Sequence, residues 1–334
     1  MTALSEKVLT TESTEATETT EATEAAEAAE AKETAEATKT PEAEKTTAAE
    51  ESARPGPGRP AESAAPVLAV RDVRIGDLAG DREIVHGVSF TLTPGRAVGI
   101  VGESGSGKTL TCRAALGILP AHFEITGGSV EIDGTDIAGL SPARWTELRG
   151  ATISAVFQDP ASYLNPSIRV GTQIAEVVRV KNGLKRRAAR RRAVELLRAV
   201  HLRDPELVHD QYPHELSGGM LQRVLIAAAI AAGPRILIAD EATTALDVTV
   251  QAEILDLLAD LRESTGLALV VVSHDLAVVA QLCDEVLVMR QGEVVEQGPT
   301  REVLHAPRHE YTRLLIAEHE QYGLDTFLAP GEDA

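Results

Sequence analysis

A glycine-rich segment carries the clearest chemistry in this sequence. It consists of Gly102, Glu103, Ser104, Gly105, Ser106, Gly107, Lys108 and Thr109, with an apolar run at 97–101 before it and a helix-like run at 110–119 after it. Glycines let backbone N–H groups curl around a phosphate at a helix start, a lysine adds charge beside the β- and γ-phosphates, and a threonine hydroxyl can ligate Mg²⁺. This strand, loop and helix predict a nucleotide phosphate site.

An acidic pair follows a second apolar run. Asp240 and Glu241 come directly after residues 235–239, which read as a buried strand. An aspartate at the end of such a strand can hold the Mg²⁺ shell, and a glutamate beside it can polarise a water for in-line attack on the γ-phosphate. We therefore expect Thr109 and Asp240 to serve Mg²⁺ and Glu241 to act as the catalytic base.

A short motif lies between these two segments. Alone, Ser217, Gly218 and Gly219 would indicate a turn and a helix cap. The order of phosphate loop, Ser-Gly-Gly motif and acidic strand resembles that of the ATP-binding cassette (ABC) ATPases. The resemblance implies that ATP is held between two domains, the phosphate loop of one facing the Ser-Gly-Gly of the other. The chain is then expected to be inert as a monomer and to hydrolyse ATP as a dimer.

Three further residues match positions of that family. Gln158, after 152–157, matches the glutamine that senses Mg²⁺ and the attacking water; Asp247, in Ala-Leu-Asp, matches the loop that crosses the dimer interface. His274, after the run at 267–273, matches the histidine that contacts the γ-phosphate. By resemblance the catalytic group is Glu241, His274 and Gln158, with Mg²⁺ served by Thr109, Gln158 and Asp240.

Several stretches are most similar to the oligopeptide, dipeptide and nickel importer branch of the family. They lie at 157–166, 212–220, 243–251 and 298–315, and Met220 is typical of one of the two ATPase subunits of such importers. The resemblance implies a second, non-identical ATPase subunit, two membrane permeases and an external solute-binding protein. It also implies a peripheral position on the cytoplasmic face of the cell membrane.

One position departs from the family pattern. The family places an aromatic ring upstream of the phosphate loop to stack on adenine, but no aromatic residue occurs between Val67 and Ser89, and Asp77 stands roughly at that place. We therefore hypothesise weak or unselective adenine binding. The identity of the residue that stacks on adenine is left open at this point.

The elements that must position these residues alternate along the chain. Strand-like runs occur at 67–73, 85–92, 97–101, 129–132, 152–157, 235–239, 267–272 and 285–289. Helical patterns replace them at 170–180 and 186–199. Alternating strands and helices predict an α/β fold. The resemblance to ABC ATPases further implies a core with the parallel sheet of P-loop NTPases. It also implies an antiparallel β subdomain and an inserted helical subdomain at about 160–225.

Composition separates an amino-terminal tail from the folded part. Residues 1–66 contain 15 Glu, no Asp and six Lys or Arg, with Glu at every third position from Glu12 to Glu36 and a Pro/Gly-rich linker at 54–60. That period leaves no apolar face on a helix, so we expect a disordered, solubilising tail, although a regulatory role is an alternative. The ABC domain is expected at 67–322 and a flexible carboxyl terminus at 323–334.

Charge and apolar content exclude several classes of protein. The 334 residues carry a formal charge of −19, which disfavours general nucleic-acid binding, and 43% hydrophobic residues suffice for a core. No apolar run approaches the roughly 20 residues that span a bilayer, and Cys112 and Cys283 read as core residues in a reducing compartment. The histidines at 201, 209 and 214 lack metal-ligand spacing.

Two alternatives to a peptide importer stay open. The solute could be nickel, an opine or another small molecule, because the cargo contacts belong to other subunits. In a different class, a soluble ABC ATPase would act on nucleic acid or ribosomes. Such relatives typically carry two cassettes or long coiled coils, and neither occurs in these 334 residues.

Overall fold

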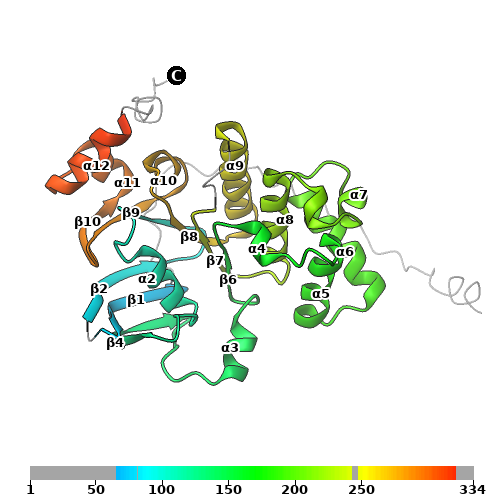
Figure 1. Ribbon diagram of the computed structural model, residues 1–334, viewed down its shortest axis with the longest axis horizontal. Coiled ribbons are helices and arrows are strands. Elements are labelled where there is room, and N and C mark those ends of the chain that lie inside the picture. The colour runs from blue at the N-terminus through cyan, green and yellow to red at the C-terminus, as the bar shows by residue number, and fades with distance from the viewer. Residues whose placement is uncertain (1–64, 81, 243–246, 321–334) are drawn as a thin grey trace, which may run out of the picture. The chain divides into compact units, whose positions relative to one another are not determined.

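The computed structural model describes residues 65–80, 82–242 and 247–320, drawn in colour in Figure 1. The predicted amino-terminal tail up to residue 64, the stretch 243–246 of the predicted dimer loop and the predicted carboxyl terminus at 323–334 lie outside the described residues.

A mainly parallel sheet forms the core of the described chain. Its six strands stand in the order β10 (Glu293–Pro299), β9 (Glu285–Arg290), β3 (Ala97–Val101), β8 (Ala268–Val272), β7 (Ile236–Asp240) and β6 (Ile153–Val156). All neighbours are parallel except β9 and β10. Every residue of β3, β7 and β8 is buried, as expected for parallel strands covered on both faces.

A second sheet is antiparallel. Its four strands stand in the order β2 (Arg82–Leu92), β1 (Leu68–Asp77), β4 (Phe123–Ile132) and β5 (Thr135–Asp136). Helix α2 (Lys108–Ala115) contacts β1, β2 and β4 of this sheet and β7 of the other. Cys112 and Ala115 of α2 belong to one hydrophobic cluster with strands of both sheets. The phosphate-loop helix is therefore fixed between the two sheets.

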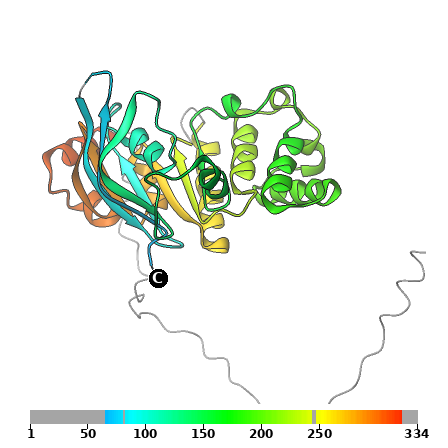
Figure 2. The same cartoon turned by 90° about the horizontal axis from the view of Figure 1, so that it is seen from below.

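A group of helices lies beside β6 and occupies one side of the sheet in both views (Figures 1 and 2). It comprises α4 (Pro160–Tyr163), α5 (Val170–Asn182), α6 (Arg186–Ala199), α7 (Pro205–His209), a 3₁₀ turn (Pro213–Glu215) and α8 (Gly218–Ile230). Helix α6 buries Ala189, Ala193, Leu196 and Leu197 at helical spacing and exposes its arginines. This basic run is thus the polar face of an amphipathic helix.

Five helices complete the described part. They are α3 (Pro142–Leu148), α9 (Val248–Thr265), α10 (Leu276–Leu282), α11 (Thr300–His305) and α12 (Glu310–Glu320). Helix α9 packs on α10, and α11 and α12 both contact β10. The last two helices therefore attach to the end of the parallel sheet that carries β9 and β10.

The predicted α/β fold with a parallel core, an antiparallel sheet and inserted helices is confirmed. Strand β10 was not predicted, because its sequence Glu-Val-Val-Glu-Gln-Gly-Pro is too polar to resemble a buried strand. It forms through a two-residue turn in which Gln291 and Gly292 both have positive φ, 50° and 88°. Such a turn matches the twist of an antiparallel hairpin.

Candidate nucleotide site

The predicted site residues follow the carboxyl ends of neighbouring parallel strands. The phosphate loop follows β3, His274 follows β8 by two residues, Asp240 ends β7 and Gln158 follows β6 by two residues. These strands are consecutive in the sheet, in the order β3, β8, β7 and β6. Ligands of open α/β sheets bind at this edge, so the topology gathers side chains from distant parts of the sequence.

The phosphate loop depends on three glycines in the left-handed region. Gly102, Gly105 and Gly107 have φ angles of 148°, 83° and 98°. At Gly102 a Cβ atom would lie 2.1 Å from the carbonyl oxygen of Met289 in β9, whereas at Gly105 it would meet nothing within 4 Å. The loop therefore starts in close contact with β9 and turns outward at Gly105, where its backbone is exposed.

Lys108 spans the loop from inside. Its buried ammonium donates to the carbonyl oxygens of Gly102 at 2.7 Å and Glu103 at 2.9 Å. Burial lowers the pKa of Lys108, while the carboxylates of Glu241 and Asp240 oppose that shift. The hydroxyl of Ser106 is buried without a hydrogen-bond partner, so a polar atom inside the loop is left for a ligand.

Thr109 and Asp240 meet across the site. The Thr109 hydroxyl donates to the Asp240 carboxylate at 3.2 Å, and Asp240 is only 5% exposed. Burial raises the pKa of Asp240, and the hydrogen bond from Thr109 acts in the opposite direction. A hydroxyl and a carboxylate fit Mg²⁺, which takes oxygen ligands and uses one or two protein groups beside substrate phosphates.

Glu241 and His274 form the next pair. The His274 Nδ1 atom lies 3.9 Å from Glu241 Oε1, and the Glu241 N–H donates to the carbonyl oxygen of Val272 at 2.9 Å. Glu241 has a φ of 52°, which is uncommon for a residue with a side chain. Strain of this kind concentrates at functional positions, where the surrounding structure enforces it.

A cavity of about 270 Å³ joins the predicted metal and water residues. Thr109, Gln158, Asp240 and Glu241 all contribute to its wall. Arg113 of α2 and Tyr163 of α4 line it as well and were not predicted as site residues. Tyr163 stacks on Phe157 with ring centroids 5.2 Å apart, which places α4 beside Gln158.

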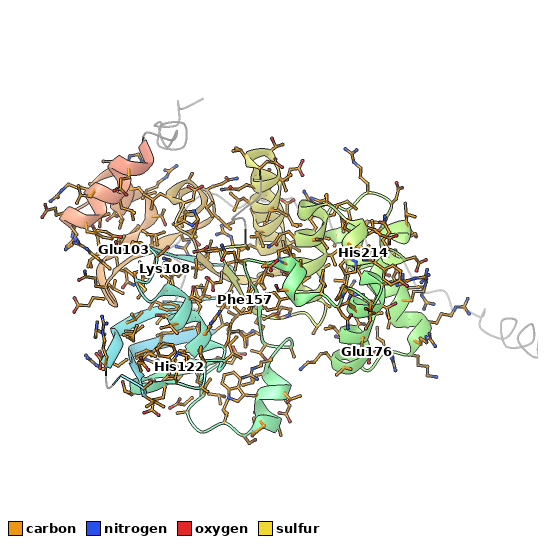
Figure 3. The ribbon with its side chains drawn as sticks, in the orientation of Figure 1. Glu103, Lys108, His122, Phe157, Glu176 and His214 are labelled. Carbon is orange, nitrogen blue, oxygen red and sulfur yellow. The ribbon has the colours of Figure 1, made fainter. Side chains whose placement is uncertain are left out.

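The Ser-Gly-Gly motif lies elsewhere in the chain. Ser217 caps α8, its hydroxyl accepting from the Met220 N–H at 3.3 Å, and both Ser217 and Gly218 are exposed. His214, three residues earlier in the sequence, lies across Phe157 from Lys108 in Figure 3. The motif is therefore not gathered with the phosphate loop of its own chain.

The start of α9 packs behind this motif. A Cβ atom on Gly219 would lie 2.6 Å from Val250 Cγ1, so glycine permits the close approach of α8 to α9. Asp247 caps α9 by accepting from the Val250 N–H at 3.0 Å, and it is exposed. Asp247 and Gly219 therefore border on the same residue, Val250.

A cavity of about 650 Å³ borders the outer turn of the phosphate loop at Gly105. Arg82, Ile84 and His86 of β2 line one part, and Arg290 lines another. Asp77 does not line this cavity, and its carboxylate accepts a hydrogen bond from the Ala79 N–H at 3.0 Å within the hairpin. The backbone of Asp77 pairs with Arg82, which does line the cavity. No sequence pattern predicted this cavity, because it depends on the register of β2 against the turn after β9.

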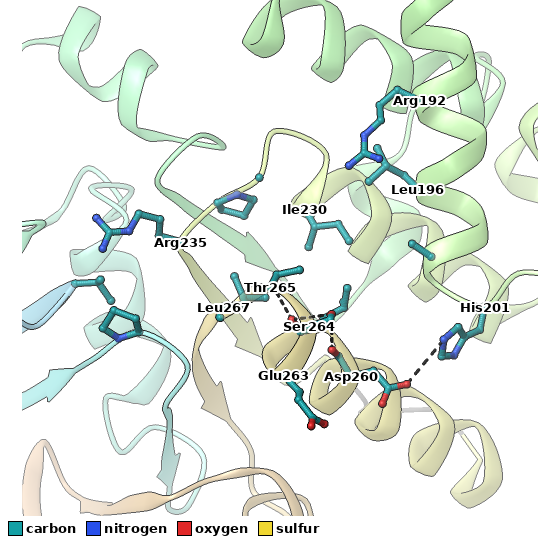
Figure 4. Close-up of a pocket in the computed structure, with 17 residues that line it drawn as sticks. Arg192, Leu196, His201, Ile230, Arg235, Asp260, Glu263, Ser264, Thr265 and Leu267 are labelled. Carbon is teal, nitrogen blue, oxygen red and sulfur yellow. Dashed lines mark hydrogen bonds and ion pairs between the residues drawn. The ribbon is translucent and has the colours of Figure 1, made fainter. Parts of the chain in front are cut away.

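Another cavity, of about 850 Å³, lies at the opposite edge of the parallel sheet (Figure 4). Pro234 and Leu267, which precede β7 and β8, line it together with Arg192 and His201. His201 Nε2 is 3.9 Å from the Asp260 carboxylate. None of the predicted site residues lines this cavity, so its size does not make it the nucleotide site.

Comparison with known proteins decides the family. The sequence profile of the ABC transporter family matches residues 85–244. The dipeptide transport ATP-binding protein DppD of Escherichia coli is 43% identical over 253 residues, 76% of this chain and 77% of DppD. The chain belongs to the ABC transporter family.

Other relatives agree. The oligopeptide transport ATP-binding protein OppD of Bacillus subtilis is 44% identical over 256 residues, 75% of this chain and 71% of OppD. A dimeric structure of the ATP-binding cassette MJ0796 in a post-hydrolysis state with ADP and Pi is similar with a TM-score of 0.62 and 29% identity, over 70% of this chain and 98% of that one. The predicted ABC ATPase class and its resemblance to peptide importer subunits are confirmed.

Another similar structure comes from a protein described as part of a transporter complex. The structure of cbiO1 from Clostridium perfringens, described as part of the ABC transporter complex cbiONQ, has a TM-score of 0.65 and 27% identity over 78% of this chain and 97% of that one. Within the described residues, none of the helices of this ABC ATPase combines the length and apolar character needed to cross a bilayer.

Proposed function

We propose that this ABC ATPase energises an importer of oligopeptides or dipeptides. The observation that carries the proposal is the convergence of Lys108, Thr109, Gln158, Asp240 and Glu241 at one edge of the sheet. The named functions of DppD and OppD support peptides as the cargo. We assign the ATPase domain to residues 67–322 and its helical subdomain to about 160–225.

The geometry supports the following assignment of the hydrolytic roles. Backbone N–H groups of the phosphate loop and the Lys108 ammonium bind the ATP phosphates, and the Ser106 hydroxyl of the same loop is buried without a hydrogen-bond partner. Thr109, Asp240 and Gln158 would hold Mg²⁺, which when bound would neutralise the charge that develops on the phosphates. Glu241 then takes a proton from a water that Gln158 orients for in-line attack.

His274 completes the γ-phosphate contacts. It lies 3.9 Å from the Glu241 carboxylate and is exposed, so it reaches the same edge as the base and remains free to contact substrate. A donor imidazole beside the transferred phosphoryl group stabilises charge on its oxygens.

We assign Ser217, Gly218 and Gly219 to the nucleotide of a second ATPase domain. Their exposed helix start can bind an anion, and His214, three residues before Ser217, lies across Phe157 from Lys108 in Figure 3. Asp247, which borders the same Val250, belongs to the dimer interface. The second domain is a non-identical subunit, so that the working unit is a heterodimer.

The remaining partners are two membrane permeases and, through them, an external solute-binding protein. Tyr163 at the end of α4 and Ile168 between α4 and α5 are 51% and 40% exposed although their side chains are large and hydrophobic. Tyr163 also lines the cavity that contains Gln158, so we assign the permease contact to the surface around this residue. The subunit is thus a peripheral protein on the cytoplasmic face of the cell membrane.

Purification of the tagged protein from gently solubilised membranes tests the proposal. We expect two multi-span permeases, a second ABC ATPase and a solute-binding lipoprotein to co-purify, and peptides to stimulate ATP hydrolysis of the reconstituted complex. Stimulation by nickel or another small solute instead would reassign the cargo. Recovery from the soluble fraction with ribosomes or DNA-bound proteins would refute transport and leave the ATPase chemistry.

A further inference from the structure

Tyr311 of α12 reaches the phosphate loop from more than two hundred residues away in the sequence. Its hydroxyl accepts a hydrogen bond from the Glu103 N–H at 3.0 Å, and the side chain is largely buried. Figure 3 shows Glu103 and Lys108 close together below α12. None of the assigned nucleotide contacts uses this tyrosine, although it belongs to the stretch 298–315 that resembles peptide importers.

The hydrogen bond holds one particular peptide group. The N–H of Glu103 and the carbonyl of Gly102 belong to the same planar unit, and that carbonyl accepts from Lys108 Nζ at 2.7 Å. Tyr311 and Lys108 therefore hold opposite sides of one peptide plane. Hydrogen bonds linked through a polarisable group strengthen one another, so the phenol supports the contact that orients the ammonium.

The position of Tyr311 is itself fixed. The Arg290 guanidinium lies 4.8 Å from the centre of the Tyr311 ring, and the backbone N–H of Tyr311 donates to His309 Nδ1 at 3.1 Å. The carboxylate of Glu296 in β10 accepts from the N–H groups of Arg308 and His309 at 2.8 and 3.0 Å. Strand β10 thereby anchors the start of α12 and brings the phenol to the loop.

We propose that Tyr311 is a positioning residue for ATP binding, which holds the Gly102–Glu103 peptide plane so that the Lys108 ammonium faces the nucleotide phosphates. The inference rests on the proposed nucleotide site. Burial raises the pKa of Tyr311, so the phenol stays protonated and neutral beside the loop near neutral pH.

The test compares Tyr311→Phe with the wild-type full-length chain. Phenylalanine keeps the packing and the contact with Arg290 but removes the acceptor for the Glu103 N–H. Tyr212→Phe is the matched control, because it removes the same hydroxyl from a ring that stacks on His214 in the helical group. Each variant is measured for hydrogen exchange of the Glu103 amide, affinity for Mg-ATP and melting temperature.

We expect Tyr311→Phe to speed exchange at Glu103 and to weaken ATP binding by roughly three- to tenfold, the effect of one net hydrogen bond. Tyr212→Phe should change neither quantity. Unchanged exchange at Glu103 would overturn the contact, and faster exchange with wild-type ATP affinity would reduce Tyr311 to a packing residue. If the wild-type chain bound no ATP, the proposed function would fail instead, while the exchange data would still decide the contact.

Discussion

Replacing Gly102 with alanine tests how the phosphate loop is held against β9. The φ of 148° disfavours any residue with a Cβ atom, and that atom would lie 2.1 Å from the carbonyl oxygen of Met289. Gly105→Ala is the matched control, because its φ of 83° is also left-handed but a Cβ there meets nothing within 4 Å. The two variants differ mainly in the clash with the backbone.

The magnitudes follow from these contacts. A side chain in the left-handed region costs about 1–2 kcal/mol, which is the expected loss of unfolding free energy for Gly105→Ala. Gly102→Ala adds about 1–3 kcal/mol, because a backbone carbonyl must move to relieve the overlap. The sum of about 2–5 kcal/mol is a large part of the roughly 5–15 kcal/mol that stabilises a folded protein.

Urea denaturation of the full-length variants measures this difference, together with ATP affinity. Gly102→Ala should unfold at a clearly lower urea concentration than Gly105→Ala with an unchanged slope. It should also bind ATP more weakly than the wild type, because the carbonyl of Gly102 is an acceptor for Lys108. Equal stability of the two variants within about 0.5 kcal/mol would refute the close contact with β9.

Three further predictions concern other parts of the chain. Asp240→Asn should abolish hydrolysis yet raise the melting temperature near pH 7. Because burial raises the pKa of Asp240, the folded protein loses stability as the pH rises above the ordinary Asp pKa and this carboxyl group ionises. Asparagine does not ionise, so its gain in melting temperature should vanish below the ordinary Asp pKa, and melting curves over a pH series check the sign. Asp77→Tyr should tighten ATP binding several-fold by placing a ring beside Arg82 at the cavity next to Gly105, and unchanged affinity would remove the hypothesis of weak adenine binding. Deletion of residues 1–60 should leave the ATP hydrolysis rate of the assembled complex unchanged, and an altered rate or altered assembly would favour the regulatory alternative.

The sequence predicted best the features that have local signals. Continuous apolar runs identified the strands β3, β7 and β8, and the glycine pattern identified the loop after β3. Asp240 and Glu241 were predictable because they stand at a strand end, and consecutive parallel strands bring such ends together. Their contacts, such as Thr109 with Asp240, then follow from the sheet order.

Features that depend on distant or polar residues could not be predicted. Strand β10 shows little alternation of apolar and polar residues and contains two glutamates, so its sequence does not resemble a strand. One of these glutamates, Glu296, nevertheless anchors the start of α12 by accepting from the N–H groups of Arg308 and His309. The contact of Tyr311 with Glu103 joins residues 208 positions apart and leaves no periodic signal. The cavity beside Gly105 likewise forms only when β2 and the turn after β9 are side by side.

Hydrolysis of Mg-ATP by the wild-type protein and by Glu241→Gln, in the complex with its co-purified subunits, tests the central claim most directly. Glutamine keeps the shape of the side chain but cannot accept the proton of the attacking water. We expect turnover to fall by roughly a hundredfold or more while ATP stays bound, the size of a lost general base. Hydrolysis at the wild-type rate by Glu241→Gln would contradict the assignment of Glu241 and the mechanism built on it.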